Sequence, residues 1–345
     1  MRRWYNLTSR QRGGARGVPE SRAAPNTRER VVDTPMETSS AHDKPLPPVL
    51  RDKVVVVLGA GKVGSAVAAL LGGAGLVVAA VTTRSVATAE PAAALVGAEP
   101  GTDNAAAAKL GDIVLVTTND DAIAGVVAEA AEKGAFRPGQ LVMHMSGALP
   151  LSVLAPAAEA GAAIGCAHPM QSFATAQDAL RLIGGSVFGI TSGPGAAELL
   201  GAVVGVLGGQ AVVVADANKV LYHAAAVVAS NYLVALEDVA AHLLVEAGFD
   251  EESALAALQP LVSGTVGNIG ALGTTNALTG PIVRGDVDTV RRHTEALRDL
   301  SGGELELYRT LGRRTVEIAR RRGQLDAETI RALLSVLAEE PGERD

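Results

Sequence analysis

A cluster of three glycines constrains the fold of this chain more than any other feature. The sequence GAGKVG occupies positions 59–64, directly after a valine-rich run and before an alanine-rich run. A strand, this glycine pattern and a helix together are typical of a dinucleotide-binding loop. The first glycine permits a tight turn, the second lets the backbone approach a diphosphate, and the third allows close packing of the helix. N–H groups at the helix start favour phosphate. We predict contacts from Gly59, Gly61, Lys62, Val63 and Gly64; the alternative is a turn that only packs.

The end of the next predicted strand indicates which dinucleotide is bound. Sites that prefer NAD usually carry an Asp or Glu about 20 residues after the glycines, bonded to the ribose 2′-hydroxyl. Here the chain has Thr83, Arg84 and Ser85, and no carboxylate before Glu90. A guanidinium and hydroxyl groups can bind the 2′-phosphate of NADP. We therefore predict NADP as the cofactor, with NAD less favoured; the alternative for Arg84 is an exposed loop residue.

The pattern of apolar runs predicts an α/β fold. Predicted strands and helices alternate from residue 51 to residue 215, which is typical of a parallel sheet covered on both faces. The strands are expected at 54–59, 76–83, 112–118, 140–147, 161–166, 186–191 and 210–215, and the helices at 63–72, 122–133, 150–161 and 195–208. Only helices are expected afterwards, at 217–247, 251–268, 286–302 and 303–322, with a turn-rich stretch at 269–285. The prediction is a Rossmann doubly wound sheet over 51–215, followed by a smaller all-α domain over 216–338.

Composition narrows the possible partners. Residues 1–50 are rich in Arg, Pro, Ser and Thr and predict a disordered tail; a transit peptide, or an over-extended reading frame with Met36 as the start, stays open. The whole chain has a net charge of −7 and no basic stripe, which argues against nucleic acid. Cys166 is the single cysteine, so no disulfide framework is expected and the chain fits a reducing cytoplasm. The longest apolar stretch, 54–81, is interrupted by polar residues and glycines, so no membrane span is expected.

Polar residues at the strand ends are candidates for the site, because ligands of such sheets bind beyond the carboxyl ends of the strands. Thr117 and Asn119 end one predicted strand and are expected to line the cofactor. Ser146 ends the next, where the nicotinamide ring is expected; the alternative is a helix-capping serine. His168 follows another strand, where it could donate to a substrate oxygen; a histidine bonded to backbone is an equal alternative. The scattered histidines predict no metal site.

Four segments carry a family resemblance: MHMSGAL (143–149), CAHPMQSFA (166–174), KVLYHAAAVVASNYLVAL (219–236) and ALTGPIVRGDVDTVRRH (277–293). Over about residues 51–335 the chain resembles a bacterial family of predicted oxidoreductases with a Rossmann-like domain and a C-terminal domain of unknown function. The family is a distant relative of the 6-phosphogluconate dehydrogenase, ketopantoate reductase and prephenate dehydrogenase superfamily. The resemblance implies an NADP-linked enzyme whose helical domain helps to form a homodimer. It supplies no substrate.

The predicted start of the helical domain offers groups for proton supply. Lys219 and His223 are four residues apart and share one helix face. In superfamily relatives a lysine at a similar junction, with an asparagine further along the helix, orients the substrate and protonates its oxygen. Here Asn231 is 12 residues beyond Lys219, so the one-turn pair of the relatives is not reproduced and His223 is the competing acid. The alternative is an exposed lysine beside a core histidine.

These observations favour an NADPH-dependent oxidoreductase that transfers hydride to the carbonyl of a small acidic substrate, such as a 2-oxo acid resembling ketopantoate. The expected catalytic residues are Ser146, His168, Lys219, His223 and Asn231. A decarboxylating dehydrogenase of prephenate-like acids is an alternative, because a similar His-Pro-Met stretch occurs in prephenate dehydrogenases. A non-catalytic NADPH-binding sensor is a further alternative.

Overall fold

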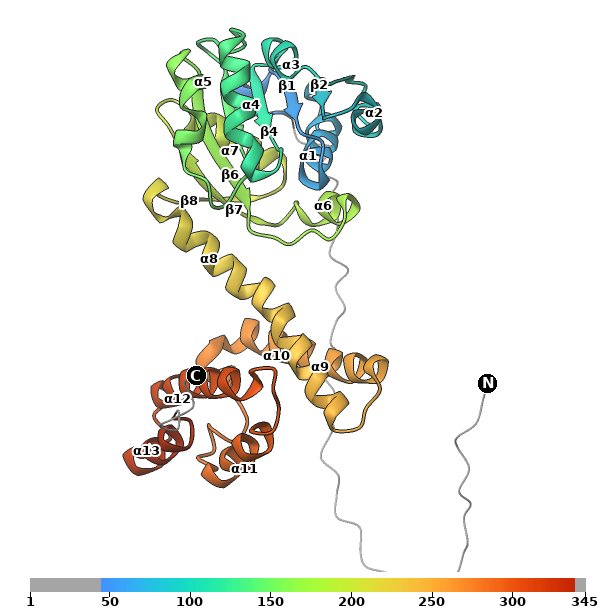
Figure 1. Cartoon of the computed structure of the whole chain (residues 1–345). Coiled ribbons are helices and arrows are strands. Elements are labelled where there is room, and N and C mark those ends of the chain that lie inside the picture. The colour runs from blue at the N-terminus through green and yellow to red at the C-terminus, as the bar shows by residue number, and fades with distance from the viewer. Residues whose placement is uncertain (1–44, 339–345) are drawn as a thin grey trace, which may run out of the picture. The chain divides into compact units, whose positions relative to one another are not determined.

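The structure is a computed structural model and describes residues 45–338 (Figure 1). Most of the expected disordered tail lies outside this range. Its last residues, however, belong to the fold, because the short 3-10 helix η2 (Pro48–Leu50) inserts Leu50 into the core, where it is fully buried. The predicted tail boundary at residue 50 is therefore several residues too late.

An eight-stranded sheet forms the N-terminal part of the described chain, in the order β3-β2-β1-β4-β5-β6-β7-β8. The strands are β1 (Val54–Leu58), β2 (Val77–Thr82), β3 (Glu99–Gly101), β4 (Ile113–Val116), β5 (Leu141–His144), β6 (Ala163–Pro169), β7 (Val187–Ser192) and β8 (Gln210–Val213). All neighbouring pairs are parallel except β6 and β7, which are antiparallel. The predicted doubly wound sheet is confirmed, but it is mostly rather than wholly parallel. The helix between β6 and β7, α6 (Ala176–Leu182), packs on another helix, α1 (Lys62–Gly73), and so does not form a crossover on the sheet face.

Alternating side chains of the sheet enter two separate cores. In β1, Val55 and Val57 belong to one core, whereas Val56 and Leu58 belong to the other. Period-two alternation with both faces apolar is expected for a sheet covered by helices on both sides. The covering helices are α1, α2 (Val86–Ala94), α3 (Asn104–Leu110), α4 (Asp120–Glu132), α5 (Ala155–Glu159) and α7 (Ala197–Val206), with the 3-10 helix η3 (Leu151–Leu154) before α5.

Between β2 and β7, the sequence patterns missed four short elements, namely α2, β3, α3 and α6. Helix α2 contains Pro91, and β3 has only three residues including Pro100, so neither carries a clear periodic signal. Helix α3 is alanine-rich and depends on Asp103, whose side chain accepts hydrogen bonds from two backbone N–H groups at the helix start. Local capping rather than apolar periodicity therefore specifies α3.

Helices alone follow β8 in the described residues, as predicted, although the boundary at 215 and 216 stays a prediction. They are η4 (Asp216–Asn218, 3-10), α8 (Lys219–Ala229), α9 (Asn231–Glu246), α10 (Glu251–Ala277), α11 (Val287–Leu297), α12 (Glu304–Arg322) and α13 (Ala327–Val336). The predicted helix 217–247 is divided into α8 and α9 by a distorted turn at Ser230, where φ is −116° and ψ is −67°; the Val234 N–H still donates to the Ser230 carbonyl. Helix α10 extends into the stretch predicted to be turn-rich and kinks at Gly273, where φ is +72°. Helix α13 has no counterpart in the predicted elements.

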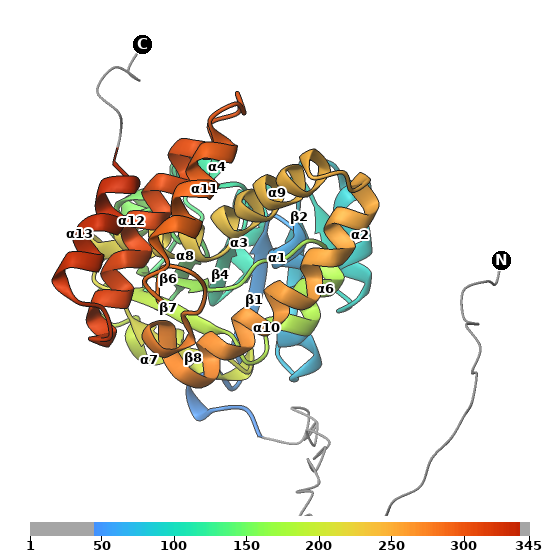
Figure 2. The same cartoon turned by 90° about the horizontal axis from the view of Figure 1, so that it is seen from below.

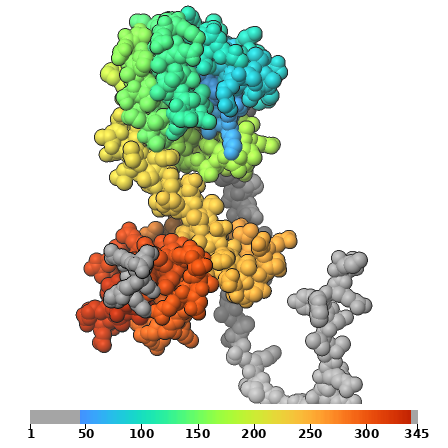
Figure 3. Space-filling model, in the orientation of Figure 1, coloured from blue at the N-terminus to red at the C-terminus, as the bar shows by residue number. Residues whose placement is uncertain are grey.

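The helical region has a small core at one end and exposed apolar residues at the other. Val290, Val316 and Leu333 from α11, α12 and α13 are fully buried together. In contrast, Leu221 of α8 is 76% exposed and Val234 of α9 is 69% exposed. Helices α9 and α10 lie beside each other, and α8 lies at the surface in the space-filling view (Figures 2 and 3). Residues 216–246 and 251–277 are long and apolar enough to cross a membrane by length and composition only.

Candidate cofactor and catalytic site

The turn between β1 and α1 depends on two of the predicted glycines. Gly59 has a φ of +103°, and a Cβ added to it would lie 2.6 Å from the backbone nitrogen of Thr118. A Cβ on Gly64 would overlap the carbonyl of Gly59 and lie 2.5 Å from the Thr117 hydroxyl, which donates a 2.6 Å hydrogen bond to that carbonyl. Both positions therefore require glycine, as the motif predicts.

We name residues 59–64 together with Thr117 the glycine cradle. Within it, Gly61 has a different role from Gly59 and Gly64. A Cβ on Gly61 would meet nothing within 4 Å, so packing does not require a glycine there. Gly61 instead lines two cavities, one on each side of the start of α1. A bare backbone at the open N-terminus of a helix suits a diphosphate. The residues present therefore fit a dinucleotide.

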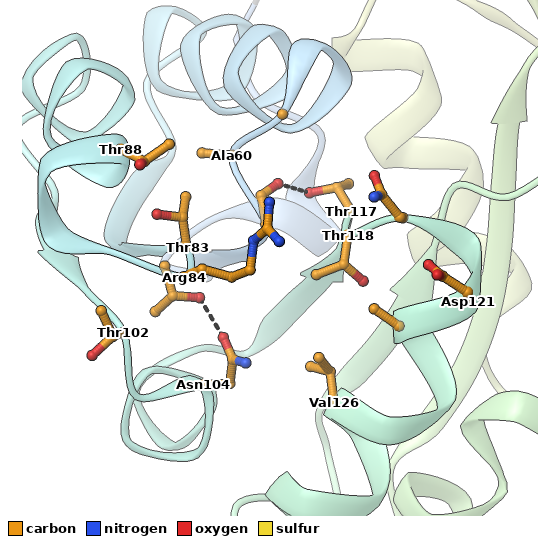
Figure 4. A pocket seen from close by; sticks show the side chains of 15 residues that line it. Ala60, Thr83, Arg84, Thr88, Thr102, Asn104, Thr117, Thr118, Asp121 and Val126 are labelled. Atoms are coloured by element: carbon orange, nitrogen blue, oxygen red, sulfur yellow. Dashed lines mark hydrogen bonds between the residues drawn. The ribbon is translucent and has the colours of Figure 1, made fainter.

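The first cavity has a volume of about 490 Å³ and lies toward β2 and β3. Arg84 extends across it from the end of β2 (Figure 4). The predicted residue Ser85 does not line this cavity; its hydroxyl lies 2.6 Å from that of Thr88, which does. The lining residues are Gly59, Ala60, Gly61, Thr82, Thr83, Arg84, Thr88, Thr102, Asn104, Thr117, Thr118, Asn119, Asp121, Ala122 and Val126. Several of these come from elements that the sequence patterns missed.

The second cavity has a volume of about 540 Å³ and lies toward the end of β5. It shares Gly61 and the residues after β4 with the first cavity. Its lining residues are Gly61, Lys62, Val63, Val116, Thr117, Thr118, Asn119, Asp120, Ile123, Met145 and Ser146. A dinucleotide with its diphosphate over Gly61 would reach both cavities, with the adenosine half near Arg84 and the nicotinamide half near Ser146.

Lys219 joins the start of α8 to the end of β5 and the middle of β6. Its ammonium donates to the carbonyl oxygen of Ser146 at 3.2 Å and to the sulfur of Cys166 at 2.9 Å, and the residue is only 2% exposed. Burial raises the pKa of the Cys166 thiol, and the nearby Lys219 ammonium opposes that shift. The alternative of an exposed lysine is therefore excluded. Lys219 is held between the end of β5 and the middle of β6.

His168 and His223 approach each other at the same place, with Gly147 between them. Their ring centroids are 5.9 Å apart, and a Cβ on Gly147 would lie 2.8 Å from His223 Nδ1 and 2.9 Å from His168 Nε2. Burial, then the charges of His223 and Lys219, lower the pKa of His168 to about 4, so it is neutral at pH 7. His223 Nδ1 is buried and has no hydrogen-bond partner within residues 45–338.

Two side chains at this place, those of His144 and Tyr222, were not predicted. His144 ends β5, and its Nδ1 accepts a 3.1 Å hydrogen bond from the Ser146 backbone N–H. Burial lowers its pKa to about 3, with Lys219 and His168 contributing. The Tyr222 hydroxyl lies 3.1 Å from His168 Nδ1. We name the group His144, Ser146, His168, Lys219 and His223 the histidine cluster. The MHMSG pattern carried a signal for His144. In the predicted strand 140–147, residues 144 and 146 are two positions apart, so their side chains share one face of the strand.

The structure does not bring Asn231 to the histidine cluster. Asn231 is the exposed first residue of α9, beyond the distorted turn at Ser230. Twelve residues of helix correspond to about 18 Å along the axis. Its predicted catalytic role within one chain therefore has no geometric support.

Comparisons with known proteins agree with this architecture. Residues 38–169 match the family described as a Rossmann-like domain, and residues 186–315 match DUF2520, a domain of unknown function. No curated protein matches the chain.

Solved structures resemble the chain over most of its length. A proposed NADP oxidoreductase from Bacteroides fragilis is 25% identical with a TM-score of 0.60, over 77% of this chain and 98% of that one. A protein from Thermotoga maritima is 23% identical with a TM-score of 0.64, over 78% and 99%. An imine reductase from Myxococcus stipitatus in complex with NADP+ is 21% identical with a TM-score of 0.52, over 81% and 99%.

These matches confirm the predicted fold, and they support the predicted pyridine-dinucleotide cofactor, NADP before NAD. The Bacteroides fragilis protein is described as an NADP oxidoreductase, and the Myxococcus stipitatus protein as an imine reductase. The chain thus joins an N-terminal Rossmann-like domain to a C-terminal helical DUF2520 domain, the combination that its sequence resemblance predicts.

Proposed function

We propose that the protein is an NADPH-dependent reductase that transfers hydride to the carbonyl of a small acidic substrate of the 2-oxo acid type. One observation carries the proposal: Ser146 lies both in the second cavity of the cofactor site and in the histidine cluster. The place expected for the nicotinamide ring is therefore next to groups that can hold a proton. When bound, the cofactor supplies the hydride.

The chain's own residues would bind and orient both partners. The backbone around Gly61 and the N-terminus of α1 would hold the diphosphate, and Arg84 would hold the 2′-phosphate. His223 is the proposed proton donor, because its Nδ1 is buried and unpartnered within the described residues and faces the Gly147 turn. Neutral His168 would donate a hydrogen bond to the substrate oxygen. Lys219 would position the end of β5 relative to the middle of β6 through Ser146 and Cys166.

Reduction of a C=N bond is a second candidate reaction. Structural neighbours include the Myxococcus stipitatus imine reductase and a Plasmodium falciparum pyrroline carboxylate reductase with NADP bound, 12% identical with a TM-score of 0.51. These likenesses support the fold, and a carbonyl and an imine need the same hydride donor and a nearby proton. The neighbours' substrates make C=N compounds a necessary part of the test.

We further propose a homodimer in which a second copy covers the exposed apolar residues of α8, α9 and α10. Leu221, Val234 and Leu261 are 66% to 76% exposed, which is unfavourable for side chains of this size in water. Val234→Glu is expected to yield monomers in sedimentation experiments, whereas Val77→Glu on β2, where Val77 is 62% exposed, is not. A monomeric wild type that floats with lipid vesicles would support a membrane surface instead.

The reaction is tested by NADPH consumption. Purified protein is mixed with NADPH and with ketopantoate, other 2-oxo acids or cyclic imines, and absorbance at the reduced-nicotinamide band is followed. Turnover of a 2-oxo acid supports the first candidate, and turnover of imines alone supports the second. Tight NADPH binding without any turnover would contradict the enzyme proposal and favour a sensor.

A further inference from the structure

Two charged side chains, Lys62 and Asp120, line the second cavity. Lys62 is the first residue of α1, beside the proposed diphosphate position, and its ammonium donates to the Phe173 carbonyl at 3.4 Å. Asp120 is the first residue of α4 and lines the cavity together with Met145 and Ser146 at the end of β5. The negative charge therefore lies on the side expected for nicotinamide.

Ser146 holds this carboxylate in place. Its hydroxyl donates to Asp120 Oδ2 at 2.6 Å and accepts hydrogen bonds from the backbone N–H groups of Ala148 and Leu149 at 3.3 and 3.2 Å. The single hydroxyl proton of Ser146 is thus already used. Within residues 45–338, Asp120 Oδ1 has no hydrogen-bond partner, and the residue is exposed. The group available to a ligand in the second cavity is therefore the Asp120 carboxylate, held in place by Ser146, rather than the Ser146 hydroxyl proton.

We propose that Asp120 determines the preference of the site for the oxidation state of the cofactor, favouring NADP+ over NADPH. This inference rests on the proposed function. The two forms differ at the nicotinamide ring, which carries a positive charge only when it is oxidised. A fixed negative charge near the ring attracts that form and leaves the neutral ring almost unaffected.

The preference would help the chain to act as a reductase. Tighter binding of the oxidised form lowers the reduction potential of the bound couple, by about 30 mV for a tenfold ratio in a two-electron reaction. Bound NADPH then becomes a stronger hydride donor.

Cofactor titration tests the inference without a substrate. The full chain, as wild type, Asp120→Asn and Asp121→Asn, is titrated with NADPH and NADP+ by calorimetry. The first substitution keeps the acceptor for Ser146 and removes the charge. We expect it to weaken NADP+ binding about five- to tenfold and to change NADPH binding less than twofold.

Asp121 provides the matched control, because it is the next residue of α4 but lines the first cavity. The adenosine halves of both cofactor forms are identical, so Asp121→Asn is expected to change the two affinities by the same factor. If Asp120→Asn proves unfolded, Asp120→Ser removes the same charge and its expected effect is the same.

The outcomes separate this inference from the function on which it rests. Equal changes in the two affinities on removal of Asp120, with tight wild-type binding, would overturn the inference and leave the proposed function intact. Failure of the wild type to bind either form would overturn both. A selective loss of NADP+ affinity at Asp121 would place the ring in the other cavity and would also overturn the inference.

Discussion

The glycine cradle and the histidine cluster lie at neighbouring strand ends but differ in the groups that they present: mainly backbone in the cradle, and buried titratable side chains in the cluster. The cradle consists of backbone and small polar side chains around open cavities. In the cluster, His144 and Lys219 are buried, and the pKa values of His144 and His168 are far below the usual range. Backbone at a helix start binds a common phosphate group, whereas buried titratable groups serve a particular reaction. We therefore propose that the cradle provides cofactor affinity and that the cluster provides chemistry.

The largest expected effect is in the cluster. His223→Ala removes the proposed proton donor and is expected to lower kcat about 100- to 1000-fold while leaving NADPH affinity unchanged. Steady-state kinetics with the best substrate and NADPH titration give the two readouts. His293→Ala is the control, because His293 lies on α11 and lies 2.8 Å from the Tyr308 hydroxyl outside the cluster. An unchanged kcat in His223→Ala would contradict the division of roles.

The next effect separates two glycines of the cradle. Gly61→Ala places a methyl group in the space shared by both cavities and is expected to lower NADPH affinity about 100-fold with little change in stability. Gly64→Ala overlaps the Gly59 carbonyl, so it is expected to lower the free energy of unfolding as well, by about 3 kcal/mol. Thermal unfolding and NADPH titration of both variants test this. Normal NADPH affinity in Gly61→Ala would show that the diphosphate lies elsewhere.

The cluster is also expected to make stability depend on pH. His144 and His168 have folded pKa values of about 3 and about 4, below the unfolded value, so the unfolded chain binds more protons between pH 4 and 6.5. The free energy of unfolding therefore falls as pH falls through this range, by about 2 kcal/mol per histidine at pH 5. Denaturant unfolding at pH 7.5 and pH 5 measures it. His144→Leu is expected to remove about half of this loss; an unchanged loss would mean that His144 is not buried in its neutral form.

The smallest of these effects concerns cofactor choice at Arg84, which lines the first cavity beside the cradle. Arg84→Ala is expected to lower NADPH affinity about tenfold, because it removes a charge-assisted contact to the 2′-phosphate. NADH lacks that phosphate, so its affinity is expected to stay the same. Fluorescence titration with both cofactors measures the ratio. Equal losses for NADPH and NADH would assign Arg84 to the shared part of the dinucleotide.

The cradle was more predictable from sequence than the cluster, for physical reasons. A contiguous motif specifies a turn through residues that are neighbours in the chain, so Gly59 and Gly64 could be assigned directly. The cluster joins residues from β5, β6 and α8, and only side-chain packing brings them together. Ser146, His168, Lys219 and His223 were predicted one at a time, but the contact of Lys219 with Cys166 was not.

Other features depended on elements without periodic sequence signals. The antiparallel pairing of β6 and β7 depends on where α6 packs, and α6 has only seven residues. Asn104 lines the first cavity from α3, and this helix was not predicted because it is specified by one capping aspartate, Asp103. Asn231 was placed among the active residues by analogy with superfamily relatives, but the 12 residues between Lys219 and Asn231 correspond to about 18 Å along a helix axis.

The central claim is that the glycine cradle binds a pyridine dinucleotide and that Arg84 beside it selects the phosphorylated form. Calorimetric titration of the full chain with NADPH and NADH, at one salt concentration, tests it most directly. The account predicts saturable one-to-one binding of NADPH per chain, at least about tenfold tighter than that of NADH. Absence of binding by both cofactors, or tighter binding of NADH, would contradict it.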